Sequence, residues 1–171
     1  MSVLDGWRLC PRCGADLRRG DERVECGACG FVAYANPAVA ASALCLDDRG
    51  RLLLARRAHE PYRALWDVPG GFLGEYEHPL DCLRRELREE TGLEVEPGAF
   101  VGAWVDRYGP GDRDRGTLNL YWTARFVRGE ARAADDVSEL RWFDLRDLPG
   151  PDELAFRTIP EVLAAFREEQ S

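Results

Sequence analysis

The spacing of hydrophobic residues between positions 79 and 93 predicts an amphipathic helix. Leu80, Leu83 and Leu87 recur at intervals of three and four residues, which places them on one helical face that can pack on a sheet. Pro79 suits the first turn of a helix, and Gly92 suits the left-handed position that ends one. We therefore predict a helix of about thirteen residues that begins at Pro79 and ends before Gly92.

Shorter apolar runs elsewhere in the chain predict strands. Two of them, at 39–46 and 52–55, flank the turn-forming sequence Asp-Asp-Arg-Gly and predict a hairpin. The remaining runs predict strands at 100–105, 118–127 and 140–143, a polar loop at 107–116 and a last helix at about 159–168. Strands and helices alternate irregularly, which is typical of an α/β domain with a mixed sheet and flanking helices, here residues 35–171.

Charge narrows the range of functions. The chain has 31 acidic and 23 basic residues, a formal charge of −8, and every basic residue is an arginine. The lack of lysine excludes Schiff-base chemistry and a P-loop lysine, and the acidic balance disfavours nucleic acid as a partner unless metal ions intervene. No apolar run reaches the roughly 18 residues that cross a bilayer, and a signal-peptide core is missing, so we expect a cytoplasmic protein without a membrane partner.

Four of the six cysteines form two Cys-x2-Cys pairs, Cys10 with Cys13 and Cys26 with Cys29, and glycines stand beside the sulfurs. In a reducing compartment this spacing indicates zinc, and four thiolates close a tetrahedral shell without an open position. We therefore predict a structural zinc ribbon over residues 1–34, with a redox pair as the alternative. The sequence leaves open whether the ribbon packs on its own chain, forms a homodimer or contacts another protein.

Acidic residues gather on the predicted helix. Glu86 and Glu90 lie one turn apart with Glu89 beside them, so three carboxylates share one face. A run of glutamates on a helix ordinarily forms a solvent-exposed acidic face. Here, however, a Gly-Gly segment that can approach a ligand closely precedes the helix, Glu77 ends that loop, and Arg85 lies one turn before Glu89. A hard divalent cation fits this set because it prefers carboxylate oxygens.

Residues 71–93 resemble the Nudix box, and nine fixed positions of that motif are matched: Gly71, Glu77, Arg85, Glu86, Leu87, Glu89, Glu90, Gly92 and Leu93. Such a long pattern is far more specific than a lone glycine-rich motif. The resemblance implies a Nudix-type α/β/α sandwich and Mg²⁺- or Mn²⁺-dependent hydrolysis of a nucleoside diphosphate linked to another moiety. With its ribbon, the chain is similar to the zinc-ribbon branch of Nudix hydrolases, which acts on NADH, ADP-ribose or FAD.

The resemblance also implies a role for each matched residue. Glu86 and Glu90 are expected to bind the metal ion, Glu89 to join them, and a backbone carbonyl near Gly70 or Gly71 to add a further ligand. Glu77 is expected to support the loop or the metal-bound waters. Arg85 is expected to orient a glutamate of the box. In this family the general base is either a box glutamate or a carboxylate on a downstream loop. The downstream candidates are Asp135, Asp136 and Glu139, which also read as solvated residues before a strand.

Substrate-binding groups are less well defined by the sequence. Arg56, Arg57, Arg107, Arg113 and Arg115 are cations near the predicted site, and each is also an ordinary surface residue.

Aromatic residues that can stack on a base, or equally fill the core, are Trp66, Trp104, Tyr108, Tyr121 and Trp122. From both sets we single out Arg56, Trp66, Arg107 and Tyr108 as substrate contacts.

The expected function is therefore a pyrophosphohydrolase for substrates such as ADP-ribose, NADH or FAD. NADH pyrophosphatases carry a Ser-Gln-Pro-Trp-Pro-Phe-Pro array after the box, and residues 100–108 of this chain lack it. That difference argues against NADH and RNA caps as substrates. Two alternatives remain at this stage: a pyrophosphatase that removes unwanted nucleoside triphosphates, and a non-catalytic nucleotide sensor that uses the ribbon to contact a partner.

Overall fold

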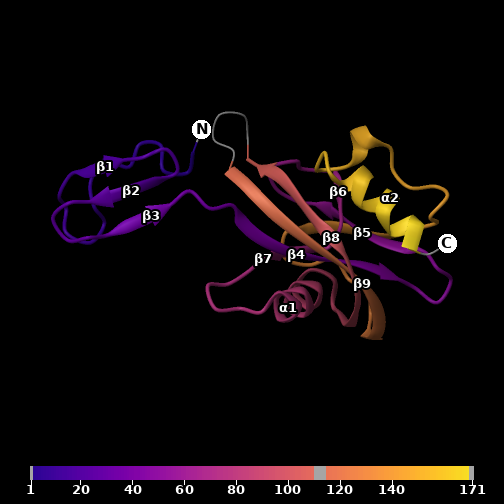
Figure 1. The fold of residues 1–171 in the computed structure, drawn as a ribbon. Coiled ribbons are helices and arrows are strands. Elements are labelled where there is room, and N and C mark those ends of the chain that lie inside the picture. Colours follow the sequence, from indigo (N-terminus) through magenta and orange to yellow (C-terminus); the bar gives the residue numbers. More distant parts are fainter. Residues whose placement is uncertain (1, 110–114, 170–171) are drawn as a thin grey trace.

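The structure, a computed structural model, describes residues 2–109 and 115–169. The N-terminal part is a small antiparallel sheet in the order β1-β2-β3, formed by β1 (Leu17–Arg19), β2 (Arg23–Cys26) and β3 (Val32–Tyr34). This part projects from one end of the larger sheet, and a single connection after β3 joins the two (Figure 1). The last strand of this part, β3, ends at Tyr34.

The larger sheet is mixed, as predicted. Its strands are β4 (Ala38–Leu46), β5 (Leu52–Arg57), β6 (Trp66–Asp67), β7 (Gly70–Phe72), β8 (Leu93–Tyr108), β9 (Arg115–Gly129) and β10 (Val137–Phe143). The main order is β10-β5-β4-β9-β8, with β6 on β5 and β7 on β4. Only β4 and β9 run parallel, and the other pairs within the described residues are antiparallel. The strands predicted at 100–105 and 118–127 are much longer in the structure because they pair with each other along most of their length.

The predicted hairpin at 47–50 forms only at its turn. Leu46 pairs with Leu52, and beyond that point β4 and β5 separate. The short strands β6 and β7 then pair with β5 and β4 respectively. This separation in the middle of the sheet determines where the pocket described below can form. The hydrophobic periodicity of the sequence does not predict the separation.

Helix α1 (Pro79–Thr91) covers one face of the sheet and α2 (Ile159–Glu169) the other (Figure 1). A short 3-10 helix, η2 (Pro151–Glu153), precedes α2. The bounds of α1 are those predicted: the His78 ring nitrogen accepts from the Leu80 N–H, and Gly92 ends the helix at φ 71°. Among residues 2–109 and 115–169, neither helix has the length and hydrophobicity needed to cross a bilayer.

Two hydrophobic cores follow from the alternation of side chains along β4. Ala41, Ala43 and Cys45 face α1, where Leu83 and Leu87 are fully buried. Leu44, on the opposite face, packs with the buried residues of α2. A helix on each side of one mixed sheet is the α/β/α sandwich that the sequence predicts.

Candidate active site

The four paired cysteines converge in the N-terminal part. Their sulfur atoms all lie within 4.8 Å of one another, with Cys10 and Cys29 at 3.6 Å and Cys13 and Cys26 at 3.6 Å. Gly14 and Gly30 adopt φ values of 75° and 73° and donate their N–H groups to the carbonyls of Cys10 and Cys26. Two tight turns that aim four sulfurs at one point fit a tetrahedral zinc ion, so the residues present match the predicted group.

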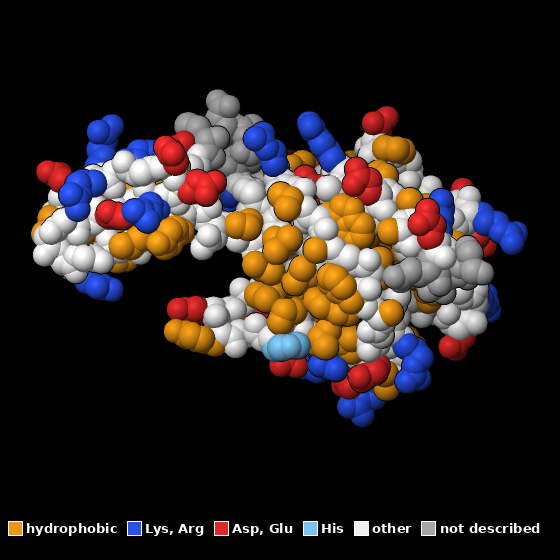
Figure 2. All heavy atoms as spheres, viewed as in Figure 1, with side chains coloured by type: hydrophobic (Ala, Val, Ile, Leu, Met, Phe, Trp, Pro, Cys, Tyr) orange, Lys and Arg blue, Asp and Glu red, His pale blue; other side chains and the backbone are white. Residues whose placement is uncertain are grey.

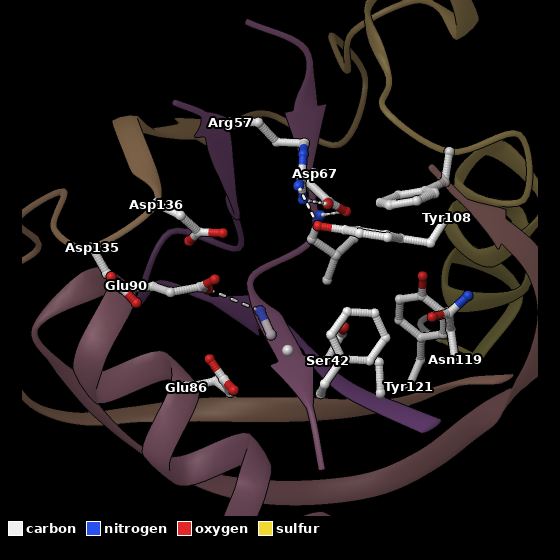
Figure 3. Close-up of a pocket in the computed structure, with 16 residues that line it drawn as sticks. Ser42, Arg57, Asp67, Glu86, Glu90, Tyr108, Asn119, Tyr121, Asp135 and Asp136 are labelled. Carbon is white, nitrogen blue, oxygen red and sulfur yellow. Dashed lines mark hydrogen bonds and ion pairs between the residues drawn. The ribbon is translucent and has the colours of Figure 1, made fainter. Parts of the chain in front are cut away.

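The larger domain contains a pocket of about 240 Å³ where β4 and β5 separate. Figure 3 shows the carboxylates of Glu86, Glu90, Asp135 and Asp136 on one side of this pocket. Glu86 and Glu90 come from α1, whereas Asp135 and Asp136 come from the loop before β10. Residues separated by about fifty positions in the sequence thus meet at one place.

Glu90 is the most buried carboxylate of this group, with 7% of its surface exposed. Its Oε2 accepts a hydrogen bond of 3.0 Å from the N–H of Gly70. Burial, together with repulsion from Asp136, raises the pKa of Glu90 to about 9. A carboxylate in this environment is stabilised as an anion by a nearby cation, so Glu86 and Glu90 fit a divalent metal ion with oxygen preference.

Glu86 is half-buried against the backbone of Gly71. A Cβ atom at position 71 would lie 2.6 Å from Glu86 Oε2, so the carboxylate would have to move to admit a side chain there. The glycine therefore allows the carboxylate to occupy this position. Burial raises the pKa of Glu86, and the Arg85 guanidinium opposes this shift from 2.7 Å. The Gly71 carbonyl, one of those expected to add a metal ligand, also accepts from the Cys82 thiol at 3.5 Å.

Arg85 joins the loop before α1 to the helix. Its guanidinium contacts Glu77 and Glu89 and donates to the carbonyl of Phe72. Two bonds of 2.8 Å from Arg85 hold the pKa of Glu77 down at about 2. These contacts tie the loop before α1 to the helix. Glu89 is half-exposed, contacts Arg85 at 3.1 Å and does not line the pocket.

The three candidate general bases differ in position. Asp135 and Asp136 both line the pocket, and Asp135 has a φ of 55°, a left-handed conformation that aspartate tolerates. Glu139 instead forms ion pairs with Arg56 at 3.2 Å and Arg141 at 2.7 Å, outside the pocket lining. The structure therefore brings two of the three carboxylates to the same pocket as Glu86 and Glu90.

One of the four singled-out substrate contacts, Tyr108, lines the pocket. Trp66 is 5% exposed and packs edge-on against Phe143 in the core, where no ligand can stack on it. The Arg56 guanidinium lies over the same buried ring, 5.5 Å from its centroid. Arg107 is exposed on β8, and its carbonyl accepts from Tyr62. Of the other cations named from the sequence, Arg113 lies outside the described residues.

Arg57 is the arginine that reaches the pocket. Its guanidinium contacts Asp67 at 3.2 Å and donates to the Tyr108 hydroxyl at 3.2 Å (Figure 3). Asp67 is largely buried, and burial raises its pKa to about 6 although Arg57 opposes the shift. Sequence reasoning named Arg57 only as one cation among five and missed Asp67. The position of Asp67 immediately before the Val-Pro-Gly-Gly-Phe segment is the one signal that could have indicated it.

Phe72 and Phe156 also line the pocket and were not predicted. Phe72 directly follows the two glycines that the sequence marked for close approach, so its place could have been inferred. Phe156 lies in an irregular segment before α2, and nothing in its local sequence indicates that it reaches the site. Trp104, Tyr121 and Trp122 pack largely as core residues, although the edge of Tyr121 meets the pocket.

Comparison with known proteins agrees with this geometry. A NUDIX domain model matches residues 36–166. An ADP-ribose pyrophosphatase from Methanocaldococcus jannaschii is 34% identical over 118 residues, which cover 68% of this chain and 67% of that protein. An NAD-capped RNA hydrolase, NudC, from Stutzerimonas stutzeri is 28% identical over 83% of this chain. The chain spans about half the length of this and similar NudC relatives, with 50% of the Stutzerimonas protein covered.

A solved structure supports the same assignment over nearly the whole chain. A NUDIX hydrolase from Nitrosomonas europaea superposes with a TM-score of 0.78 at 26% identity, covering 95% of this chain and 91% of that one. A MutT NUDIX hydrolase from Burkholderia pseudomallei gives a TM-score of 0.66 at 26% identity and covers 76% of this chain. The box residues, the sandwich and these matches together show that the chain belongs to the Nudix hydrolase family.

Proposed function

We propose that this protein is a divalent-metal-dependent pyrophosphohydrolase that cleaves a nucleoside diphosphate linked to a second moiety, as in ADP-ribose. The observation that carries the proposal is the convergence of Glu86 and Glu90 with Asp136 in one pocket that also contains Arg57. The name of the Methanocaldococcus relative, ADP-ribose pyrophosphatase, supports the same substrate class.

The charge of the pocket favours a diphosphate diester over a triphosphate. Among the described residues that line it, five are acidic and Arg57 is the one cation, already paired with Asp67. A nucleoside triphosphate carries more negative charge than a diphosphate diester, and so needs more positive charge from the protein. The triphosphatase alternative is therefore disfavoured on electrostatic grounds.

In the proposed mechanism Glu86 and Glu90 would hold Mg²⁺ or Mn²⁺. The cation would neutralise charge on the diphosphate and supply a more acidic water. Arg57 orients a phosphate oxygen from the opposite side of the pocket. Asp136 accepts the proton of the attacking water, because it lines the pocket beside Glu90, and Asp135 is its neighbour at the loop turn. Arg85 acts as a positioning residue through its ion pair with Glu86.

A substrate panel tests this proposal. ADP-ribose, NADH, FAD and the common nucleoside triphosphates are incubated with the full chain, with and without Mg²⁺, and AMP and inorganic pyrophosphate are quantified. We expect Mg²⁺-dependent release of AMP from at least one dinucleotide-like substrate. Pyrophosphate release from triphosphates alone would favour the triphosphatase. Tight binding of ADP-ribose without turnover of any compound would favour the sensor.

The assignment of Asp136 as general base has its own test. Asp136→Asn is expected to lower kcat by about two orders of magnitude, as is typical for loss of a general base. Glu139→Gln is the matched control. This carboxylate lies three residues further on, in β10, but it is paired with Arg56 and Arg141 away from the pocket. Equal effects of the two substitutions would place the base elsewhere.

A further inference from the structure

The Arg57 side chain is held at the pocket by three acceptors that come from different parts of the chain. Its Nε donates to the Pro61 carbonyl at 2.9 Å, its Nη1 to Asp67 at 3.2 Å, and its Nη2 to the Tyr108 hydroxyl at 3.2 Å (Figure 3). Pro61 lies in the loop after β5, Asp67 in β6, and Tyr108 at the end of β8. Because a guanidinium is planar and rigid, acceptors on all three nitrogens fix its orientation.

Two of the five guanidinium N–H groups of Arg57 remain for a ligand. Within residues 2–109 and 115–169, the three contacts above are the hydrogen bonds that this guanidinium makes to protein. They leave one N–H on each of the two terminal nitrogens. Arg57 lines the pocket, and a two-bond contact between an arginine and a phosphate uses two such N–H groups.

Asp67 is a carboxylate at a position where the fold does not need one. It lies in the two-residue strand β6, whose backbone pairs with Ala55 of β5, and this pairing does not involve the side chain. One carboxylate oxygen accepts from the Val68 N–H at 2.8 Å, and the other accepts from Arg57. The side chains of Arg57 and Asp67 are only 14% and 16% exposed, and burial of charged groups is costly. The pair is therefore better explained by a role in the pocket than by stability.

The charge of Asp67 by itself is unfavourable for binding a phosphate. Asp67 adds a negative charge to a pocket that four other acidic residues line within the described part of the chain. Coulomb repulsion from this carboxylate lowers the affinity for an anion. Its contact with Arg57 acts in the opposite direction, because a restrained arginine loses less side-chain freedom when the ligand binds. The sign of the net effect therefore distinguishes the two roles.

The neighbouring ion pair shows the same chemistry without a pocket. Arg56 contacts Glu139 at 3.2 Å, but their side chains are 41% and 35% exposed, and neither residue lines the pocket. Solvent screens such an exposed pair, so it contributes little. Arg57 and Asp67 both line the pocket and are sheltered from solvent. The Arg56–Glu139 pair therefore provides a matched control.

We propose that Asp67 is a positioning residue, which holds the Arg57 guanidinium so that its two remaining N–H groups contact a phosphate of the substrate. This inference rests on the proposed function, because it names the group that orients the phosphate-binding arginine. It predicts that loss of the Asp67 carboxylate weakens the binding of a diphosphate although the loss removes a negative charge. Repulsion alone predicts tighter binding.

The probe is α,β-methylene-ADP, a nucleoside diphosphate analogue whose methylene bridge replaces the anhydride oxygen. Its dissociation constant is measured by calorimetry on the full chain with Mg²⁺ present. Asp67→Ala is expected to bind the probe about five- to tenfold more weakly than the wild type, which corresponds to ordering one arginine side chain on binding. Unchanged or tighter binding by Asp67→Ala would overturn the proposal.

Arg57→Met provides the background that separates positioning from a general structural effect. This substitution removes the guanidinium through which Asp67 acts. Asp67→Ala in the Arg57→Met background is therefore expected to change the affinity by less than about twofold. A five- to tenfold loss in both backgrounds would show that Asp67 does not act through Arg57, and would refute the inference.

Two further variants at Asp67 test the hydrogen bond itself. Asp67→Asn keeps an oxygen that can accept from Arg57, and is expected to bind the probe within about threefold of the wild type. A loss as large as that of Asp67→Ala, in proteins that melt as the wild type does, would contradict the proposed contact. Asp67→Leu also lacks an acceptor and replaces Asp67→Ala if that variant does not fold. Glu139→Ala, which removes the partner of Arg56, is expected to leave the affinity unchanged.

These measurements separate this inference from the proposed function. An affinity loss in Asp67→Ala that depends on Arg57, in a protein without turnover of the substrate panel, would support the positioning role and refute the hydrolase mechanism. Turnover of ADP-ribose together with unchanged or tighter binding by Asp67→Ala would do the reverse.

Discussion

At the scale of single residues, Glu90 combines features that are rarely found together. It is buried, it accepts a hydrogen bond from the Gly70 backbone, and its neighbours Glu86 and Asp136 carry the same charge. Such a carboxylate is costly for the fold unless a cation balances it. The arrangement is therefore better explained by metal binding than by stability.

Glu90→Gln is expected to lower kcat by about two or more orders of magnitude, equivalent to about 2.7 kcal/mol of transition-state stabilisation. The fold should remain intact because the amide oxygen of glutamine can still accept from Gly70. Steady-state kinetics with Mg²⁺, together with circular dichroism, tests both points.

Glu89→Gln provides the comparison for this experiment. Glu89 belongs to the same helix and the same motif, but it is half-exposed and paired with Arg85 outside the pocket. We expect a loss of less than about tenfold in kcat. Losses of equal size at the two positions would contradict the distinction that the structure makes between these glutamates.

At the scale of elements, helix α1 is a platform to which the preceding loop is attached through Arg85. This one guanidinium binds Glu77 by two hydrogen bonds, the Phe72 carbonyl by another, and Glu86 by an ion pair. The loop from β7 to α1 is thus held by the same side chain that forms an ion pair with Glu86, a proposed metal ligand. A substitution at Glu77 is expected to lower the stability of the loop directly. Any effect on activity is expected to be indirect, through the position of Glu86.

The Glu77–Arg85 contact predicts a defined pH dependence. The pKa of Glu77 lies near 2 in the folded protein, below the value of about 4.3 for an unfolded chain. Its stabilising contribution is therefore complete above about pH 4.3 and is lost as the pH falls toward 2. Glu77→Gln should lower the urea midpoint at pH 7, and the difference from the wild type should shrink at pH 3.5. A difference that stays constant with pH would show that the carboxylate charge is not involved.

At the scale of the whole molecule, the four-cysteine ribbon and the Nudix domain have separate stabilising centres. The four sulfurs of the ribbon surround one point, whereas the two cores of the larger domain lie on either face of its sheet. The ribbon projects from the sheet (Figures 1 and 2). Its cysteines are not among the residues that line the pocket. A module of this size would draw folding free energy from a zinc ion held by its four thiolates.

Cys26→Ser is accordingly expected to abolish stable zinc binding and expose residues 1–34 to proteolysis, while Mg²⁺-dependent turnover stays within about threefold of the wild type. Metal analysis, limited proteolysis and kinetics measure the three effects. Cys45→Ala is the control, since this buried cysteine lies in the sheet and should leave the zinc in place. Complete loss of turnover with an intact larger domain would show that the ribbon contributes to catalysis.

Local sequence was sufficient for the features that depend on neighbours along the chain. Helix α1, its proline start and glycine end, the four-cysteine cluster and the grouping of Glu86 with Glu90 all follow from spacings shorter than about 20 residues. These elements appear in the structure as predicted. The geometry of a helix, and of the tight turns that hold the cysteine pairs, fixes the relative positions of these residues before any tertiary contact forms.

Tertiary structure alone decided which distant residues share the pocket. The separation of β4 from β5 brings Arg57, Asp67 and Phe156 to the glutamates, moves Trp66 into the core and leaves Arg56 on another surface. Hydrophobic periodicity along the chain does not predict this separation, because it arises where β6 pairs with β5 and β7 pairs with β4. The sequence by itself thus determined the glutamate-bearing helix and the family, and long-range strand pairing determined which residues line the pocket.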